Sequence, residues 1–399
     1  MASPQSPSSS PRHYSLFLAI FSLAVGGFCI GTTEFVAMGL IQEIAHNLKI
    51  TVPEAGHFIS AYALGVVIGA PIIAILGAKV PRKTLLLCLM LFYGIANACT
   101  ALAHTPETVL VSRFIAGLPH GAYFGVGALV AAELAGPSRR ASAVAQMMMG
   151  LTVATVIGVP LATWLGQHFG WRAGFEFSAT IAFFTLIAVA CFVPNIPVQA
   201  TASIKTELAG LMNINMWLTL AVGAIGFGGM FSVYSYVSPI LTEYTKVNIQ
   251  IVPIALALWG IGMVIGGLAA GWLADKNLNK TIVGVLISSA IAFVVASFLM
   301  SNIYSAIGSL FLIGLTVMGL GGALQTRLMD VAGDAQTLAA SLNHSAFNLA
   351  NALGAFLGGW VLSHQMGWIA PIWVGFVLSL GGLIILLIAF AVEKATQKA

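Results

Sequence analysis

The stretch GVVIGAPIIAILGAK, at residues 65–79, returns in the second half of the chain as GMVIGGLAAGWLADK, at residues 262–276. The two stretches lie 197 residues apart, and the same offset aligns residues 117–118 with residues 314–315. A third match has an offset of 196 and joins GVPLATWLGQHFGW, at residues 158–171, to GAFLGGWVLSHQMGW, at residues 354–368. Three ordered matches at nearly one offset indicate that the chain is an internal duplication.

The composition of the chain identifies its solvent. Hydrophobic residues make up 59% of the 399 residues and charged residues only 7%, whereas a soluble domain has roughly a quarter of its residues charged. The chain is therefore expected in a lipid bilayer. Its four cysteines lie in apolar runs without close spacing, so we expect no disulfide framework, no metal site and no cofactor. The net charge of +4 is attributed to membrane orientation, and no nucleic-acid partner is expected.

Apolar runs of sufficient length are the main fold signal, because a hydrocarbon core of about 30 Å needs roughly 20 helical residues to cross it. Twelve such runs are predicted at residues 14–41, 54–77, 84–103, 106–134, 141–167, 173–194, 215–238, 251–274, 280–300, 303–326, 336–363 and 368–391. The predicted fold class is an all-α membrane protein with twelve transmembrane helices in two pseudo-symmetric six-helix bundles.

Polar stretches divide the chain into domains. Residues 1–13 are rich in serine and proline and are expected to form a disordered cytoplasmic tail. The first six-helix bundle is assigned to residues 14–194 and the second to residues 215–392. A cytoplasmic linker, residues 195–214, joins them, and residues 393–399 are expected to form a second cytoplasmic tail.

Basic residues predict the orientation, since they concentrate in cytoplasmic loops. With the N-terminus inside, only Lys49, Arg172 and Lys246 fall on the outer side. The residues predicted to be cytoplasmic are Arg12, Lys79, Arg82, Lys83, Arg139, Arg140, Lys205, Lys276, Lys280, Arg327, Lys394 and Lys398. We therefore expect a multi-pass protein of the cytoplasmic (inner) membrane with both termini in the cytoplasm.

Two motifs point to a family. Residues 271–276, GWLADK, match a Gly-x-Leu-Ala-Asp-Lys loop pattern, although Ala78 replaces the aspartate at the corresponding place in the first half. Arg113, Gly117 and Gly121 form an Arg-x-x-x-Gly-x-x-x-Gly pattern in the fourth predicted span. On these residues the chain resembles the major facilitator superfamily from about Tyr14 to its end. The resemblance implies a secondary transporter that rocks around a central site.

Four further stretches resemble the drug:proton antiporter branch, near its arabinose-efflux-like and chloramphenicol-efflux-like members. They are TTEFVAMGL at residues 32–40, SAYALGVVIGAP at residues 60–71, LPHGAYFGVGALVAAE at residues 118–133 and SLNHSAFNLANALGA at residues 341–355. This resemblance implies export of a small organic molecule (a drug, sugar or related metabolite) in exchange for protons, by alternating access.

Glu34 and Arg113 are the predicted proton-coupling and substrate residues. Both fall about seven residues from the outer end of their spans, which places them at nearly the same depth. Charged side chains within a membrane are costly, and they are functional by default. We expect Glu34 to bind a proton or a cationic substrate alternately and Arg113 to tune it. The alternative is a static buried ion pair that only orders the helices.

Several other polar and aromatic residues are candidates for lining the substrate cavity. His120 is either a proton relay or an interhelical hydrogen-bonding residue, and the His344, Asn348 and Asn351 stripe either lines the substrate path or joins helices. Aromatic candidates, for which a lipid-facing or interfacial position is the alternative, are Tyr62, Tyr123, Tyr234, Tyr236 and Trp259.

Charges at the cytoplasmic ends of spans are predicted to latch the helices in one state, as the resemblance implies above all for Asp275. The alternative is that they only set the topology. The predicted gating residues are Gly271, Asp275, Lys276, Lys280, Lys79, Arg82, Lys83, Glu133, Arg139, Arg140, Arg327 and Asp330, with Asp334 beside them.

Two other functions stay open at this point. The same fold supports uptake by proton symport. A non-transporting membrane sensor or a membrane-embedded enzyme is the alternative of a different class. The sequence carries no His-Glu-x-x-His, Gly-x-Ser-x-Gly or phosphate-binding Gly-Lys-Ser/Thr motif, so we do not expect an enzyme. The expected partners are a small-molecule substrate, protons and membrane lipid, and the expected state is a monomer.

Overall fold

The computed structural model describes residues 15–77, 80–136, 139–196, 213–332 and 336–396. The predicted N-terminal tail, most of the predicted linker, Lys79 and Asp334 lie outside these residues. The described chain is helical throughout and contains twelve helices long and apolar enough to cross a membrane, which confirms the predicted fold class.

The first half contributes six of these spans. Its elements are α1 (Leu16–Gly39), α2 (Ile41–Leu48), α3 (Val52–Gly77), α4 (Arg82–Leu102), α5 (Pro106–Gly117), α6 (His120–Ala135), α7 (Arg140–Val153), the π-helix η1 (Ala154–Gly158), α8 (Val159–Phe169) and α9 (Arg172–Phe192). The short helix α2 follows the first span and belongs to none of them.

The second half contributes the other six. Its elements are α11 (Ile214–Gly226), α12 (Gly228–Tyr234), α13 (Val237–Pro239), the π-helix η3 (Ile240–Tyr244), the 3₁₀-helix η4 (Ile249–Ile251), α14 (Val252–Lys276), α15 (Leu278–Leu299), α16 (Ile303–Val317), α17 (Gly319–Ala332), α18 (Gln336–Ser363) and α19 (Ala370–Thr396). The predicted tail beginning at residue 393 starts too early, because the last helix continues to Thr396.

Proline residues explain two interruptions within spans. The fourth span is broken between α5 and α6, where Pro119 has no N–H to donate to the preceding turn. The fifth span contains η1, directly before Pro160. A π-turn at this place is the local adjustment by which a helix accommodates an irregular hydrogen-bond ladder.

The duplication predicted from the sequence reappears in the closest helix contacts. An added Cβ at Gly65 would lie 2.1 Å from the Phe114 carbonyl oxygen, and one at Gly262 would lie 2.4 Å from the Phe311 carbonyl oxygen. Both residues of the second contact follow those of the first by 197 positions. Glycine is required at these places because any side chain would overlap the neighbouring backbone.

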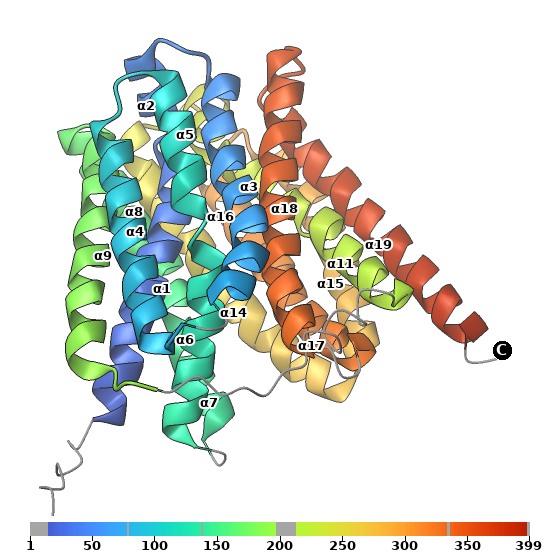
Figure 1. Cartoon of the computed structure of the whole chain (residues 1–399). Helices are drawn as coiled ribbons and strands as arrows, with labels where there is room; N and C mark the ends of the chain where they lie inside the picture. Colours follow the sequence, from blue (N-terminus) through green and yellow to red (C-terminus); the bar gives the residue numbers. More distant parts are fainter. Residues whose placement is uncertain (1–14, 78–79, 137–138, 197–212, 333–335, 397–399) are drawn as a thin grey trace, which may run out of the picture.

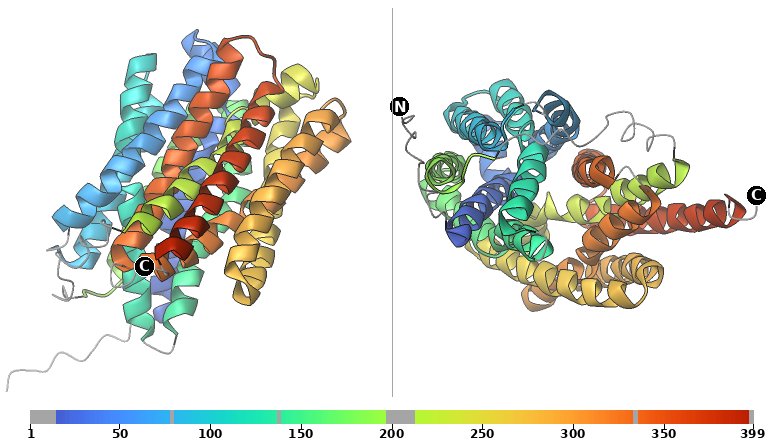
Figure 2. Two further views of the ribbon diagram at one scale, coloured as in Figure 1. Left: turned by 90° about the vertical axis from the view of Figure 1, so that its right-hand side faces the viewer. Right: turned by 60° about the horizontal axis from the view of Figure 1, so that its bottom comes forward.

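The molecule has two distinct faces at the ends of its helices. Helix α1 begins and α19 ends at the lower face in Figure 1, which we call the termini face. The opposite face carries α2, and we call it the α2 face. Figure 2 shows the helices of the first half, blue to green, gathered on one side and those of the second half, yellow-green to red, on the other. Helix α3 packs against α18, and α14 packs against α8 and η1, so these elements form the junction between the halves.

Candidate functional site

Glu34 lies at the junction between the halves. It belongs to α1, and its side chain is 7% exposed. Asn351 of α18, which is fully buried, donates a hydrogen bond from Nδ2 to Glu34 Oε1 at 3.4 Å. The carboxyl group of one half is therefore held by an amide of the other half.

Arg113 lies beside this contact, as its predicted depth requires. It is fully buried on α5, and its Nη2 donates to the carbonyl oxygen of Thr33 at 3.3 Å. The guanidinium carbon lies 4.3 Å from the centre of the Tyr62 ring, a cation–π distance. No ion pair joins Glu34 to Arg113 in this conformation. Nε and Nη1 of Arg113 have no hydrogen-bond partner, although a buried N–H without an acceptor is costly.

Tyr62 connects Arg113 to a hydrogen-bonded group within the first half. Its hydroxyl lies 3.0 Å from the Tyr93 hydroxyl and 3.0 Å from Nδ1 of His120. Tyr93 in turn donates to the carbonyl oxygen of Ile30 at 3.4 Å. His120 thus has an interhelical partner, whereas Tyr93 was missed because it lies in an otherwise apolar run. Its spacing of four residues from Asn97, another polar residue within the third span, is the signal that could have identified it.

The second half places an aromatic wall opposite this group. Tyr234 and Trp259 meet edge to face with ring centres 4.9 Å apart, and Phe35 of α1 lies 5.4 Å from Tyr234. Phe35 also stacks on Phe231, with ring centres 6.2 Å apart. The Tyr234 hydroxyl and Trp259 Nε1 are buried without a partner. Buried polar groups are normally paired with protein, water or ligand, so these atoms are available for hydrogen bonds to a bound molecule.

The remaining cavity candidates serve other contacts. Tyr123 donates to the Leu23 carbonyl oxygen at 2.9 Å, and Tyr236 donates to the Ala355 carbonyl oxygen at 2.8 Å. The five aromatic candidates are all buried, so the alternative of a lipid-facing or interfacial position is wrong for them. Helix α18 divides its polar stripe. Asn348 donates to the carbonyl oxygen of its own helix at His344, and the His344 ring stacks on Phe124 of the first half at 5.9 Å.

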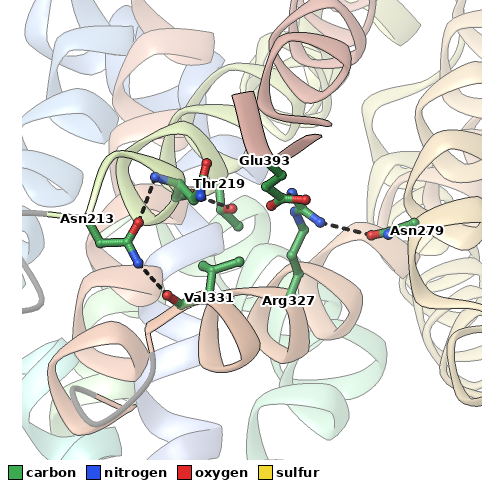
Figure 3. Close-up of polar contacts among 7 residues, drawn as sticks. Asn213, Thr219, Asn279, Arg327, Val331 and Glu393 are labelled. Atoms are coloured by element: carbon green, nitrogen blue, oxygen red, sulfur yellow. Dashed lines mark hydrogen bonds and ion pairs between the residues drawn. The ribbon is translucent and has the colours of Figure 1, made fainter. Parts of the chain in front are cut away.

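Two ion pairs tie helix ends together at the termini face, one in each half. Arg82 at the start of α4 pairs with Glu133 at the end of α6. Arg327 of α17 pairs with Glu393 near the end of α19 and donates from Nη1 to Asn279 Oδ1 of α15 at 2.9 Å, as Figure 3 shows. Glu393 was missed because it was assigned to the tail.

The other predicted gating residues make fewer contacts in this conformation. Asp275 is exposed and has no ion pair within the described part of the chain, whereas Lys276 Nζ lies 3.3 Å from the centre of the Trp272 ring. Lys83 Nζ donates to the Ala190 carbonyl oxygen at 2.7 Å. Exposed positions are also found for Gly271, Lys280, Asp330 and Arg139, and Arg140 begins α7.

Hydrogen bonds also join the halves at the α2 face. Gln42 of α2 donates to Thr242 Oγ1 at 2.8 Å and accepts from Ser238 Oγ at 2.8 Å. Gln167 of α8 donates to the Ile249 carbonyl oxygen at 3.1 Å. These contacts were not predicted, because short polar residues near helix ends carry no pairing signal in a single sequence.

Comparison with known proteins relates this architecture to transporters. The chain is 38% identical over 378 residues to the "Inner membrane transport protein YdhP" of Escherichia coli (strain K12), covering 95% of this chain and 97% of that protein. It is 34% identical to the "Putative transporter AraJ" of the same organism, over 86% of this chain and 88% of that protein. It is 29% identical to the "Chloramphenicol resistance protein" of Streptomyces lividans, over 90% of this chain and 93% of that protein.

Solved structures share the fold. The nucleoside transporter NupG (D323A mutant) superimposes with a TM-score of 0.76 at 15% sequence identity, covering 94% of this chain and all of that one. A bacterial homologue of the human lysosomal transporter Spinster superimposes with a TM-score of 0.72, also at 15% identity, over 96% of each chain. The family model of the Major Facilitator Superfamily matches residues 23–342. With its twelve spans and these relatives, the chain belongs to the Major Facilitator Superfamily of multi-pass membrane transporters.

Proposed function

We propose that this protein is a secondary active transporter that exports a small organic molecule in exchange for protons by alternating access. The observation that carries the proposal is the position of Glu34, a buried carboxyl group at the junction of two six-helix bundles and hydrogen-bonded to Asn351 of the opposite bundle. Relative motion of the bundles changes the partners and the hydration of this carboxyl group.

Proton coupling follows from that change of environment. A carboxyl group that meets water, an amide or a positive charge to different degrees in two conformations binds protons with different affinity in each. Arg113 lies close enough to act on Glu34 without being bonded to it, so its influence can change as the helices move. In this proposal Arg113 modulates the proton affinity of Glu34.

The surroundings of Glu34 suit a small organic substrate. Tyr234 and Trp259 offer apolar ring surface together with an unpartnered hydroxyl and an unpartnered N–H. Oδ1 of Asn351 and two nitrogen atoms of Arg113 are likewise unpartnered. An apolar wall with a few precisely placed polar groups is typical of small-molecule sites. A drug, a sugar or a related metabolite has the chemistry to use this combination, and the name of the Streptomyces lividans relative supports the drug class.

Opening and closing are assigned to contacts at the two faces. We place the termini face in the cytoplasm, as the basic residues predict, and the α2 face outside. The Arg82–Glu133 and Arg327–Glu393 pairs hold helix ends in place within each half, and the exposed Asp275 is the residue proposed to form a latch in the other conformation. The protein is proposed to work as a monomer.

The test uses purified protein in liposomes, because transport there depends only on the imposed gradient. Substrates are first identified by thermal shift across sugars, purines, phenicols and lipophilic cations, since binding stabilises the folded state. An inward proton gradient should then drive the identified substrate out of right-side-out vesicles. Uptake under the same gradient would instead establish proton symport.

The decisive variant is Glu34→Gln, which keeps the shape of the side chain and removes its proton. It should abolish gradient-driven transport while leaving membrane insertion unchanged. Glu176→Gln is the matched control, because Glu176 is an exposed carboxylate on α9. Undiminished gradient-driven transport by Glu34→Gln would remove the coupling role from this residue.

A further inference from the structure

A cavity of about 520 Å³ opens at the α2 face, where the two halves meet. Helix α2 and the end of α8 line one side, and the segment from Thr242 to Ile249 lines the other. The hydrogen bonds of Gln42 and Gln167 to the second half lie at the same place. The cavity is therefore complete only while the halves are closed at this face.

Glu43 is the unexplained residue of this cavity. It follows Gln42 on α2, and both of its carboxyl oxygens are buried without a hydrogen-bond partner. Oε1 of Gln167, which lines the same cavity, is also a buried acceptor without a partner. The site thus presents acceptor oxygens to one another. An ionised carboxylate is expensive in such surroundings, whereas a protonated carboxyl group is neutral and supplies a donor.

Other charged groups near Glu43 have partners elsewhere or are solvent-exposed. Arg172 donates to Asn47 Oδ1 at 2.9 Å and to the Ala103 carbonyl oxygen at 2.7 Å. Glu54 at the start of α3 accepts from the Thr51 N–H at 2.7 Å. His46 and Glu243 share the cavity and are exposed. The further groups on neighbouring elements, exposed as well, are Lys49, His57, His168 and Lys246. None of these groups forms an ion pair with Glu43.

We propose that Glu43 is a second proton-binding site, which takes up a proton when the halves close at the α2 face and releases it when they part. Parting the halves removes the far wall of the cavity and admits water to the carboxyl group. The site extends the proposed function because it makes closure of one face depend on the pH at that face. It rests on alternating access but not on the role of Glu34.

The direction of the pH effect follows from burial. Burial raises the pKa of Glu43 from its ordinary value of 4.5 to about 6 in the closed form. Protonation therefore favours the closed form, fully below pH 4.5, and this advantage is lost as the pH rises through about 6. A pKa difference of this size between the two forms changes their ratio by about 30-fold at most across the window.

The experiment measures the separation of the halves directly. Spin labels at Glu107 and Tyr304, exposed residues at the α2-face ends of α5 and α16, report the opening of that face. The full chain is studied in lipid nanodiscs without substrate or gradient, with its four cysteines replaced by alanine. The population with short label distances should fall as the pH rises from 4.5 to above 6, by up to about 30-fold relative to the open form.

The variants assign this response to one residue. Glu43→Gln is permanently neutral and should stay closed with no pH response in this window, whereas Glu43→Asp keeps a titrating group and should retain a response. Retention of the response in Glu43→Gln, or absence of a response in the unsubstituted chain, would overturn the proposal. If Glu43→Gln does not fold, a missing response in Glu43→Asp would overturn it as well.

Three control variants separate Glu43 from other titrating groups. His46→Gln and Glu243→Gln remove its neighbours in the cavity, and Glu34→Gln removes the central carboxyl group. All three should retain the response, and its loss in any of them would assign it to that residue instead. Failure of gradient-driven transport with an intact pH response at the α2 face would refute the proposed coupling at Glu34 and leave the Glu43 site standing.

Discussion

Asn351 and Glu34 are hydrogen-bonded across the junction of the two halves, with Nδ2 and Oε1 3.4 Å apart. The partners stand 317 residues apart in the chain, one on α18 and one on α1. Arg113 contacts the backbone of Thr33, the residue before Glu34, so the three side chains form one site. Four predictions follow from this geometry and from the packing around it.

Asn351→Leu should weaken transport, because leucine fills a similar volume but cannot donate to Glu34. A hydrogen bond to a charged group contributes about 1.5 kcal/mol or more, so gradient-driven transport should fall about tenfold. Asn348→Leu is the matched control on the same helix, since its amide donates to the His344 carbonyl of its own helix. Equal losses in both variants would contradict a specific role for the Glu34 contact. Initial transport rates in liposomes measure the difference.

Arg113→Lys should lose most transport activity although it keeps the positive charge. An ammonium group cannot combine flat packing on Tyr62 with the directed N–H bond to Thr33, which the planar guanidinium does. Arg113→Ala should in addition shift the pH profile of transport, because it removes the charge near Glu34. Initial rates from pH 5 to pH 8 test both variants. Unchanged profiles would separate Arg113 from Glu34.

Gly117→Ala should destabilise the first half, whereas Gly125→Ala on the same span should not. A Cβ at Gly117 would lie 2.1 Å from the Tyr62 carbonyl oxygen, while a Cβ at Gly125 would meet nothing within 4 Å. Overpacking costs about 1–3 kcal/mol, and a helical glycine replaced by alanine in open space gains about 0.5–1 kcal/mol. Thermal unfolding in detergent should show a lower midpoint for the first variant only. Similar midpoints would mean that α3 and α5 separate easily.

Arg327→Met should destabilise the second half more than Glu393→Gln does. Arg327 is 4% exposed and connects α15, α17 and α19, and its removal leaves Glu393 partly buried without its partner. Breaking such a pair from one side costs about 3–5 kcal/mol when it is fully buried, and less for the half-exposed carboxylate. A double-mutant cycle on thermal unfolding measures the coupling energy. Additive effects would show that the pair contributes nothing to the packing of these helices.

The sequence predicted the architecture well because the membrane imposes a length on every span. Twelve apolar runs became twelve helices, with most ends displaced by a few residues. The depth of Arg113 was predicted correctly for the same reason, since the rise per residue of a helix is fixed. Pro119 likewise predicted the break that the structure has between α5 and α6.

The site was predicted only in part because it depends on how two bundles meet. Nothing in one sequence states that Asn351 points at Glu34 rather than at a neighbour within its own half. Tyr93 and Glu393 were missed for different reasons, the first because tyrosine also suits an apolar span, the second because a charged helix end resembles a tail. Glu43 carried no signal, since its burial arises from the closure of the α2 face.

The distribution of hydrogen bonds between the halves has a kinetic consequence. Those that the described residues make lie at Glu34 or toward the α2 face, while the two ion pairs of the termini face each stay within one half. Opening the α2 face must therefore break polar contacts before water replaces them, and this gives that step a large activation enthalpy. Cooling should slow the cycle chiefly by trapping molecules with their α2 face shut.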